Sequence, residues 1–209
     1  MATDMTLIWF SGSPPCWRVM IALEEKNLQG YNQKLLDFLK GEHKSQEVLD
    51  INPRGQLPAF KHGNNILNES YAACLYLEEQ FKSQGTRLIP MAAPEQALTY
   101  QRMFEGENAL RDVFPEGERH DSSLKRHREA LTAELKLWEG YLEKLGAGSY
   151  LAGKNFTLAD VVVFPCIAYK NYPRLAGYYG LLKERPSVKT SWPKNWLETP
   201  QAEDKLKDI

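Results

Sequence analysis

Residues 7–23 read Leu-Ile-Trp-Phe-Ser-Gly-Ser-Pro-Pro-Cys-Trp-Arg-Val-Met-Ile-Ala-Leu, and this stretch decides how the first part of the chain folds. The apolar run at 7–10 predicts a buried strand, and the small polar residues after it predict a turn. Ser13 stands where a helix N-cap belongs, and two prolines follow in the first helical turn, where their missing N–H groups cost nothing. A helix start presents unpaired N–H groups and the positive end of the helix dipole. The stretch therefore predicts a site for an anion or a thiolate, with the Ser13 hydroxyl directed into it.

The composition is that of a folded protein with a balanced charge. The 209 residues are 43% hydrophobic and 11% aromatic, and the formal net charge is −1. This balance gives no electrostatic reason to expect binding to nucleic acid or to an acidic membrane. The longest apolar run is far too short to cross a bilayer, and the first residues lack the features of a signal peptide. We expect a cytoplasmic protein with no nucleic-acid partner and no membrane partner.

The cysteines and histidines do not form a recognisable ligand set. Cys16, Cys74 and Cys166 are far apart and odd in number, which suits reduced thiols in a reducing compartment. The four histidines show no metal-ligand spacing with the cysteines. We expect no metal and no bound cofactor. Cys16 lies one helical turn beyond the N-cap and the chain has no Cys-x-x-Cys pair, so disulfide exchange is disfavoured.

Strand and helix patterns alternate over about the first eighty residues and then give way to helix patterns alone. The predicted strands are at 7–10, 31–38, 59–61 and 66–68, and the main predicted helices of this part are at 17–26 and 71–81. The turn-rich segment 84–94 predicts a linker. Beyond it, helices are predicted at 95–111, 124–145, 161–169 and 172–183, the third of them behind a capping box at Thr157 and Asp160. The fold class is therefore an α/β domain at 1–83 followed by an all-α domain at 95–209.

This order of domains resembles the cytosolic glutathione transferases, and several motifs carry the resemblance. Residues 13–19 resemble the serine turn of the delta, theta and zeta classes. Asn52-Pro53 with Gln56-Leu57-Pro58 resembles the cis-proline loop of the family, and Glu69-Ser70 resembles its γ-glutamyl clamp. Residues 155–160 match the capping box of the helical domain. Further matches at 24–26, 100–104 and 191–193 make the rho class of aquatic animals the most similar class.

The resemblance implies a thioredoxin-like domain that binds glutathione and a helical domain that binds a small hydrophobic electrophile. It also implies that the protein is a cytoplasmic homodimer. The implied function is detoxification of xenobiotic compounds, with glutathione as co-substrate. An alignment to the delta and zeta classes, anchored on Trp17-Arg18-Val19, places the catalytic hydroxyl on Ser13. Ser11 is the competing donor, which the pattern of residues leaves open.

The resemblance, carried over residue by residue, predicts the contacts of the tripeptide. Leu57 would pair its backbone with the cysteinyl part of glutathione if the bond to Pro58 is cis; an ordinary trans proline is the alternative. Ser70 would hold the γ-glutamyl carboxylate and Glu69 the ammonium group, although both residues also suit a plain helix start. The other predicted glutathione contacts are Ser11, Gln56, and His43 with Lys44, for which a solvated basic loop is the alternative.

The predicted wall of the electrophile site consists of Trp9, Phe10, Phe104, Phe114 and Tyr169, each of which also suits the core. The chain is several residues shorter than the rho pattern at 105–115 and at 169–174, where the family builds this pocket. Two other functions fit the same fold. One is a zeta-like glutathione-dependent cis–trans isomerase, which shares Trp17-Arg18-Val19 but not the Ser-Pro-Pro turn, and the other is a non-catalytic carrier or assembly module.

Overall fold

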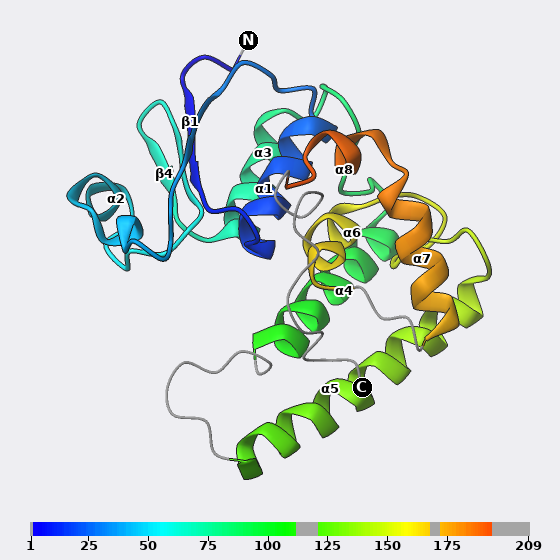
Figure 1. Cartoon of the computed structure of the whole chain (residues 1–209). Helices are drawn as coiled ribbons and strands as arrows, with labels where there is room; N and C mark the ends of the chain where they lie inside the picture. The colour runs from blue at the N-terminus through cyan, green and yellow to red at the C-terminus, as the bar shows by residue number, and fades with distance from the viewer. Residues whose placement is uncertain (1, 112–120, 168–171, 194–209) are drawn as a thin grey trace. The chain divides into compact units, whose positions relative to one another are not determined.

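The computed structural model describes residues 2–111, 121–167 and 172–193 (Figure 1). Contacts divide the chain into two compact units. The first contains the chain up to Arg87 and also α8 (Pro186–Thr190), and the second extends from Leu88 to Arg185. The sequence-based division into 1–83, 84–94 and 95–209 stays a prediction, and it does not include the packing of α8 on α1.

A four-stranded mixed sheet forms the first unit, with the strand order β2-β1-β3-β4. β1 (Met5–Trp9) pairs in parallel with β2 (Asn32–Leu35) and antiparallel with β3 (Ala59–His62). β3 forms a hairpin with β4 (Asn65–Leu67). All four predicted strands are confirmed, and their ends differ from the predicted ones by at most three residues. The mixed sheet and its helices fit the predicted thioredoxin-like domain.

The helices of this unit follow the predicted order. They are α1 (Pro14–Glu25), the short 3-10 helix η1 (Glu42–Lys44), α2 (Gln46–Ile51), α3 (Ser70–Gln80) and α8. α1 begins at the two prolines, as the sequence predicts. The chain after α8 packs on α1, because the Trp17 indole N–H donates to Ser191 Oγ at 2.9 Å and the Trp17 ring meets Trp192 edge-on at 4.9 Å.

The two faces of β1 bury different side chains, because successive residues of a strand point to opposite faces of a sheet. Ile8 and its partner Ala59 lie in one cluster with Val48 of α2. Leu7 and Phe60, which are completely buried, face the other side of the sheet, where α1 and α3 pack against each other (Figure 1). The end of β1 is thereby held from both sides, and the turn that follows it starts from a rigid position.

The second unit is helical in its described part. Its helices are α4 (Ala93–Arg111), α5 (Asp121–Leu145), α6 (Leu158–Val163), the 3-10 helix η2 (Phe164–Cys166) and α7 (Pro173–Lys183). α4 packs on α6, and α5 packs on α7. Gly106 allows the first of these contacts, because a Cβ there would lie 2.5 Å from Val163 Cγ2.

Two of the differences between the predicted and the observed helix limits in this unit have a physical reason. The predicted helix at 161–169 changes after Val163 into η2, because Pro165 has no N–H to donate and its ring crowds the carbonyl group four residues earlier. α4 begins at Ala93, inside the segment predicted as a linker. Pro94 lies in the first turn of α4, where a proline costs no hydrogen bond, so this proline belongs to the helix and not to the linker.

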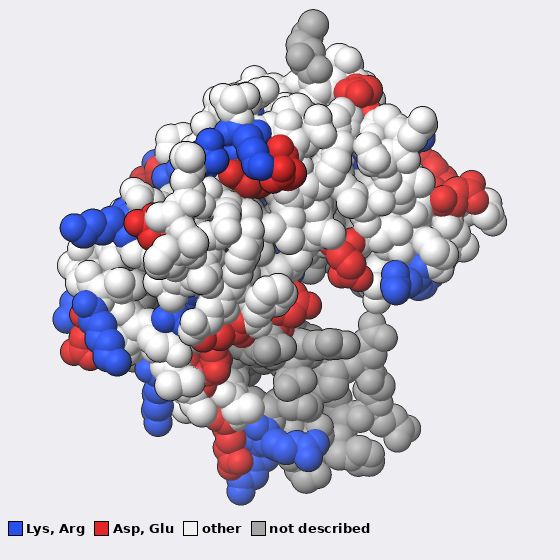
Figure 2. Space-filling model, turned by 180° about the vertical axis from the view of Figure 1, so that it is seen from behind, with Lys and Arg blue, Asp and Glu red and all other residues white. Residues whose placement is uncertain are grey.

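Within the described residues, no helix combines the length and the apolar character that a membrane span requires. Acidic and basic side chains are interspersed over the face of the molecule drawn in Figure 2. This mixture is in keeping with the formal net charge of −1.

Candidate active site

The turn between β1 and α1 places two serines beside a helix start. Gly12 has a φ of +93°, a conformation that L side chains rarely adopt, so glycine suits this turn. Ser13 is the N-cap of α1, and its Oγ accepts a hydrogen bond from the Cys16 N–H at 3.4 Å. That bond is long, and a hydroxyl that accepts a hydrogen bond can still donate its own proton. Ser13 and Ser11 are both half-buried, so each remains accessible to a ligand.

The loop before β3 lies at the same end of the sheet. β3 runs antiparallel to β1 with Ala59 opposite Ile8, so the residues before Ala59 continue past the end of β1. The Leu57–Pro58 bond is cis, which confirms the bond expected from the resemblance. Neither the N–H nor the C=O of Leu57 has a hydrogen-bond partner in the part of the chain that the structure describes. The backbone of Leu57 is therefore available for pairing with an extended ligand.

Asn52 shapes this loop from within. Its buried amide donates through Nδ2 to Gln56 O at 2.8 Å and accepts at Oδ1 from the Arg54 N–H at 3.1 Å. Lys44 reaches the same loop, because its Nζ donates to Arg54 O at 3.0 Å and a Cβ on Gly55 would lie 2.8 Å from Lys44 Cδ. The exposed side chains of Gln56 and Lys44, both predicted glutathione contacts, thus come from neighbouring loops.

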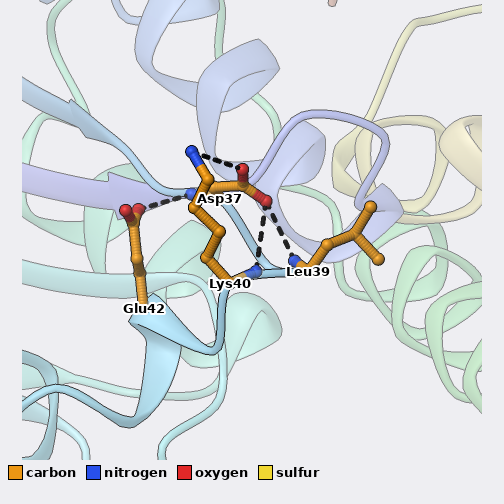
Figure 3. A network of polar contacts seen from close by, with 4 residues as sticks. All are labelled: Asp37, Leu39, Lys40 and Glu42. Atoms are coloured by element: carbon orange, nitrogen blue, oxygen red, sulfur yellow. Dashed lines mark hydrogen bonds and ion pairs between the residues drawn. The ribbon is translucent and has the colours of Figure 1, made fainter.

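A tight polar turn joins β2 to η1 (Figure 3). Asp37 Oδ1 accepts from the backbone N–H groups of Leu39 at 3.0 Å and Lys40 at 3.4 Å, and Oδ2 pairs with Lys40 Nζ at 3.3 Å. The Asp37 N–H donates to Glu42 Oε2 at 2.7 Å. The pKa of Asp37 is lowered, chiefly by the hydrogen bond from the Lys40 side chain. The turn is held by its own side chains, so the residues that it carries have fixed positions.

Phe38 lies in this turn and was not selected from the sequence. Its ring stacks on the His43 imidazole, with centroids 3.9 Å and planes 7° apart, and its centroid is 5.1 Å from that of Phe10. An aromatic row therefore connects the end of β1 to His43. The His43 Nδ1 atom is buried and has no hydrogen-bond partner among the described residues. Phe38 and Leu39 are the two large apolar residues of 37–44, and the aromatic ring of the first is the sequence signal that could have identified it.

The start of α3 carries the third group of predicted contacts. Glu69 is its N-cap and is exposed, and its side chain makes no capping hydrogen bond with any described residue. Ser70 is buried, and its Oγ accepts from Arg18 Nη1 at 3.1 Å. Arg18 also lies over the Tyr71 ring, with Cζ 4.8 Å from the centroid. The helix that begins at Ser13 is thereby connected to Ser70 through Arg18, a residue to which the sequence assigned no role.

Comparison with known proteins identifies the family. Residues 7–85 match the family description "Glutathione S-transferase, N-terminal domain", and residues 114–195 match "Glutathione S-transferase, C-terminal domain". The chain belongs to the glutathione S-transferase family. It is 62% identical to glutathione S-transferase A of the plaice, Pleuronectes platessa, over the whole of both chains. The resemblance to the rho class fits this relationship with a fish transferase.

Two solved transferase structures share the fold. A glutathione S-transferase from the Antarctic clam Laternula elliptica is 36% identical, with a TM-score of 0.82 and coverage of 94% of this chain and 95% of that chain. A glutathione transferase from Phanerochaete chrysosporium, solved in complex with oxidized glutathione, is 26% identical, with a TM-score of 0.75 and coverage of 94% and 98%. The plaice alignment spans 226 positions, whereas this chain has 209 residues. The plaice transferase therefore contains residues that have no counterpart here.

The predicted electrophile contacts of this transferase are only partly described. Trp9 and Phe10 are half-buried at the end of β1, next to the serine turn. The Trp9 Nε1 atom is buried and has no partner within the described ranges. Phe104, on α4 in the second unit, is 63% exposed. Phe114 and Tyr169 lie outside the described residues, so their assignment stays a prediction, as does that of the other three.

The buried thiols of the first unit are poor nucleophiles. Burial raises the pKa of Cys16 to about 11, although the hydrogen bond with Ser13 and the charge of Arg18 act in the opposite direction. Burial likewise raises the pKa of Cys74 to about 12. Because the thiolate is the reactive form, neither residue suits disulfide exchange at neutral pH. In the described ranges, no group of three or more His, Cys, Asp or Glu side chains could hold a metal ion.

Proposed function

We propose that this chain transfers glutathione to small hydrophobic electrophiles and that Ser13 stabilises the thiolate. The observation that carries the proposal is the half-buried Ser13 hydroxyl at the N-terminus of α1, engaged by a long bond of 3.4 Å from the Cys16 N–H. The 62% identity to the plaice glutathione S-transferase supports the type of reaction. Glutathione is a co-substrate in this reaction, whose chemistry requires no cofactor.

The chemistry depends on removing the thiol proton. A free thiol has a pKa of about 8.5, so most glutathione is protonated at neutral pH. A hydrogen bond to a charged acceptor contributes roughly 1.5–3 kcal/mol, which corresponds to about one to two pKa units. The Ser13 O–H and the positive end of α1 both favour the thiolate, and the proton is released to solvent. The sulfur then forms a C–S bond; with a chlorinated nitrobenzene, the C–Cl bond breaks and chloride leaves.

Three parts of the first unit would hold the three parts of glutathione. Ser70 and Glu69 would bind the γ-glutamyl carboxylate and ammonium groups at the start of α3. The backbone of Leu57 would pair with the cysteinyl residue, which brings the sulfur to Ser13 and Ser11. His43, Lys44 and Gln56 would contact the glycyl carboxylate. The complex of the Phanerochaete chrysosporium relative with oxidized glutathione supports binding of this ligand class.

The electrophile would lie against the aromatic side chains Trp9, Phe10, Phe104, Phe114 and Tyr169, which suits apolar xenobiotic compounds. The family relationship also supports a cytoplasmic homodimer with a role in detoxification. Sedimentation of the purified protein tests the dimer: a single species at the monomer mass at micromolar concentration would contradict it.

A steady-state assay with glutathione and a chlorinated nitrobenzene tests the reaction. Ser13→Ala is expected to lower kcat/KM at neutral pH roughly 10- to 100-fold and to move the acid limb of the pH profile of kcat/KM upward by about one to two units. The thiolate absorbance of bound glutathione, followed against pH, should show the same upward shift.

Ser11→Ala is the matched control, because Ser11 lies in the same turn and is equally half-buried. Its pH profile is expected to stay within about 0.3 units of the unaltered protein, since a shift of that size is below the worth of one hydrogen bond. A shift in Ser11→Ala but not in Ser13→Ala would reverse the assignment. Retention on glutathione resin without conjugation of several electrophiles would favour the carrier function, and isomerisation of maleylacetoacetate would favour the zeta-like enzyme.

A further inference from the structure

We propose that Arg18 is a positioning residue for the γ-glutamyl carboxylate of glutathione and acts through the Ser70 hydroxyl. The inference rests on the proposed function, because it assigns a role in binding the same ligand. It concerns the first unit alone, where α1 supplies Arg18 and α3 supplies Ser70.

The guanidinium of Arg18 is a buried positive charge that lies beside the start of α3. Arg18 is only 7% exposed. Because a guanidinium keeps its charge inside a protein, this charge is buried. Nη1 donates to Ser70 Oγ at 3.1 Å, and Cζ lies 4.8 Å from the centre of the Tyr71 ring. Ser70 and Tyr71 are the first two residues of α3. The two contacts therefore fix the guanidinium relative to the first turn of this helix.

The hydrogen bond from Arg18 decides what the Ser70 hydroxyl can do. A serine hydroxyl has one proton to donate and two lone pairs that accept. Since Arg18 occupies a lone pair, the O–H of Ser70 points away from the guanidinium and is left to donate to a second group. A carboxylate at the helix start forms the strongest hydrogen bond with this hydroxyl, because a charged acceptor strengthens the hydrogen bond.

The charge of Arg18 adds to the field at the same place. Glu69 does not cap the helix with its side chain in the described part of the chain, so the first N–H groups of α3 are not covered by it. The guanidinium charge acts to lower the pKa of Cys74, one turn further along α3, although burial outweighs it. The field of Arg18 therefore reaches the first turn of α3, where it reinforces the positive end of the helix dipole.

Binding measurements with two ligands test this role. The first ligand is glutathione, and the second is its analogue in which hydrogen replaces the α-carboxylate of the γ-glutamyl residue. Arg18→Met is expected to raise the Kd of glutathione about tenfold, the worth of a weakened hydrogen bond to a charged group, and to change the Kd of the analogue less than about twofold. The acid limb of the pH profile of kcat/KM should not move, because the thiolate is stabilised elsewhere.

Two further variants separate positioning from folding. Arg18→Lys keeps the charge but not the planar fork, and should recover part of the affinity for glutathione. Arg87→Met is the matched control, because Arg87 is exposed and belongs to the same unit; it should leave both Kd values unchanged. If Arg18→Met does not fold, Arg18→Lys measured with both ligands replaces it, with a smaller but still selective loss for glutathione.

Several outcomes would overturn the proposal. An equal loss of affinity for both ligands would mean that Arg18 only supports the fold, and an unchanged Kd of glutathione would mean that it has no role in binding. The loss of affinity in the double variant Ser70→Ala with Arg18→Met should be clearly smaller than the sum of the losses in the two single variants; a fully additive loss would contradict action through Ser70. Failure of the unaltered protein to bind glutathione would contradict the proposed function itself, whereas the other outcomes leave that function intact.

Discussion

The N-termini of α1 and α6 both start at a hydroxyl residue, yet their polar groups are used in opposite ways. At α6 the completely buried Asp160 accepts four hydrogen bonds: from the Thr157 N–H at 2.8 Å and Oγ1 at 3.1 Å, and from the Leu151 N–H and the Tyr178 hydroxyl at 3.0 Å each. At α1 the half-buried Ser13 accepts one bond of 3.4 Å. The protein itself satisfies the hydrogen bonds at the start of α6, whereas the start of α1 keeps a donor for a ligand.

The prolines explain part of this difference. Pro14 and Pro15 occupy the first two positions of α1 and have no N–H, so the backbone there offers fewer donors than an ordinary helix start. A ligand at α1 must therefore take its hydrogen bond from a side chain such as Ser13. The comparison teaches that a helix start serves stability when its polar groups are buried and paired, and serves binding when they are accessible and incompletely paired.

Removal of the Asp160 carboxylate should have the largest effect on stability. Asp160→Ala is expected to lower the free energy of unfolding by about 3–5 kcal/mol, because four buried donors lose their acceptor. Chemical denaturation followed by tryptophan fluorescence measures the change. Glu143→Ala, which removes an exposed carboxylate of α5, is the control and should change stability by less than about 0.5 kcal/mol. A comparable effect of both substitutions would remove the distinction.

Titration of Asp160 at the start of α6 should make the free energy of unfolding depend on pH. Burial raises the pKa of Asp160 from its ordinary value of 3.8 to about 6 in the folded protein. Because the folded state then holds the proton more tightly than the unfolded state, the contribution of Asp160 to stability is complete below about pH 4 and is lost as the pH rises through about 6. The loss should amount to about 2–3 kcal/mol.

This contribution is the difference in free energy of unfolding between the unaltered protein and Asp160→Asn, which cannot titrate, measured from pH 4 to pH 7. Using the difference cancels the titration of the other carboxylates. A difference that stays constant over this range, or grows with pH, would contradict a raised pKa at Asp160.

A substitution of Phe38 tests whether glutathione binding at the start of α1 depends on the aromatic side chains next to it. Phe38→Ala removes the stack on His43 and the contact with Phe10, and should raise the KM for glutathione about two- to tenfold, since an aromatic pair is worth about 0.5–1.5 kcal/mol. Leu39→Ala is the control, because Leu39 is the next residue and is 96% exposed. Equal KM values for the two variants would mean that the aromatic row has no part in binding.

The smallest expected effect is on the stability of Ser13→Ala. Its cap bond is long, so the free energy of unfolding should fall by only about 0.5–1 kcal/mol, at the lower end of the range for N-cap residues. A much larger loss would show that Ser13 serves the fold in the way that Asp160 does. Denaturation of the same protein samples used in the conjugation assay makes the comparison direct.

Much of the first unit could be predicted because its signals are local. The apolar run before Ser13, the two prolines and the turn around Asn52 each determine the backbone of their own segment, and the structure has strands and helices where they predict them. The cis bond before Pro58 is also confirmed. The start of α6 was predicted at Thr157 from the same kind of signal. The end of this helix differs from the predicted one, because the apolar run continues past Val163 whereas Pro165 ends the α-helical hydrogen bonding.

The contacts of Arg18 and Phe38 could not be predicted, because each joins segments far apart in the chain. Arg18 meets Ser70 only because α1 and α3 pack side by side, and Phe38 meets Phe10 only because β2 lies next to β1. In the sequence, Arg18 is a charged residue within an apolar helix and Phe38 is an apolar residue within a loop. Neither pattern predicts which residue the side chain will contact.

The sequence by itself determined the family, the two types of domain and the segments that carry the candidate site, since these follow from motifs and periodicity within short stretches. The tertiary structure decided which polar groups were satisfied and which were left for a ligand. Ser13 and Thr157 look alike in the sequence as N-cap residues. They differ in the structure because Asp160 is buried and fully paired, whereas the turn at Ser13 stays at the surface. Burial is a property of the whole fold, and no local pattern contains it.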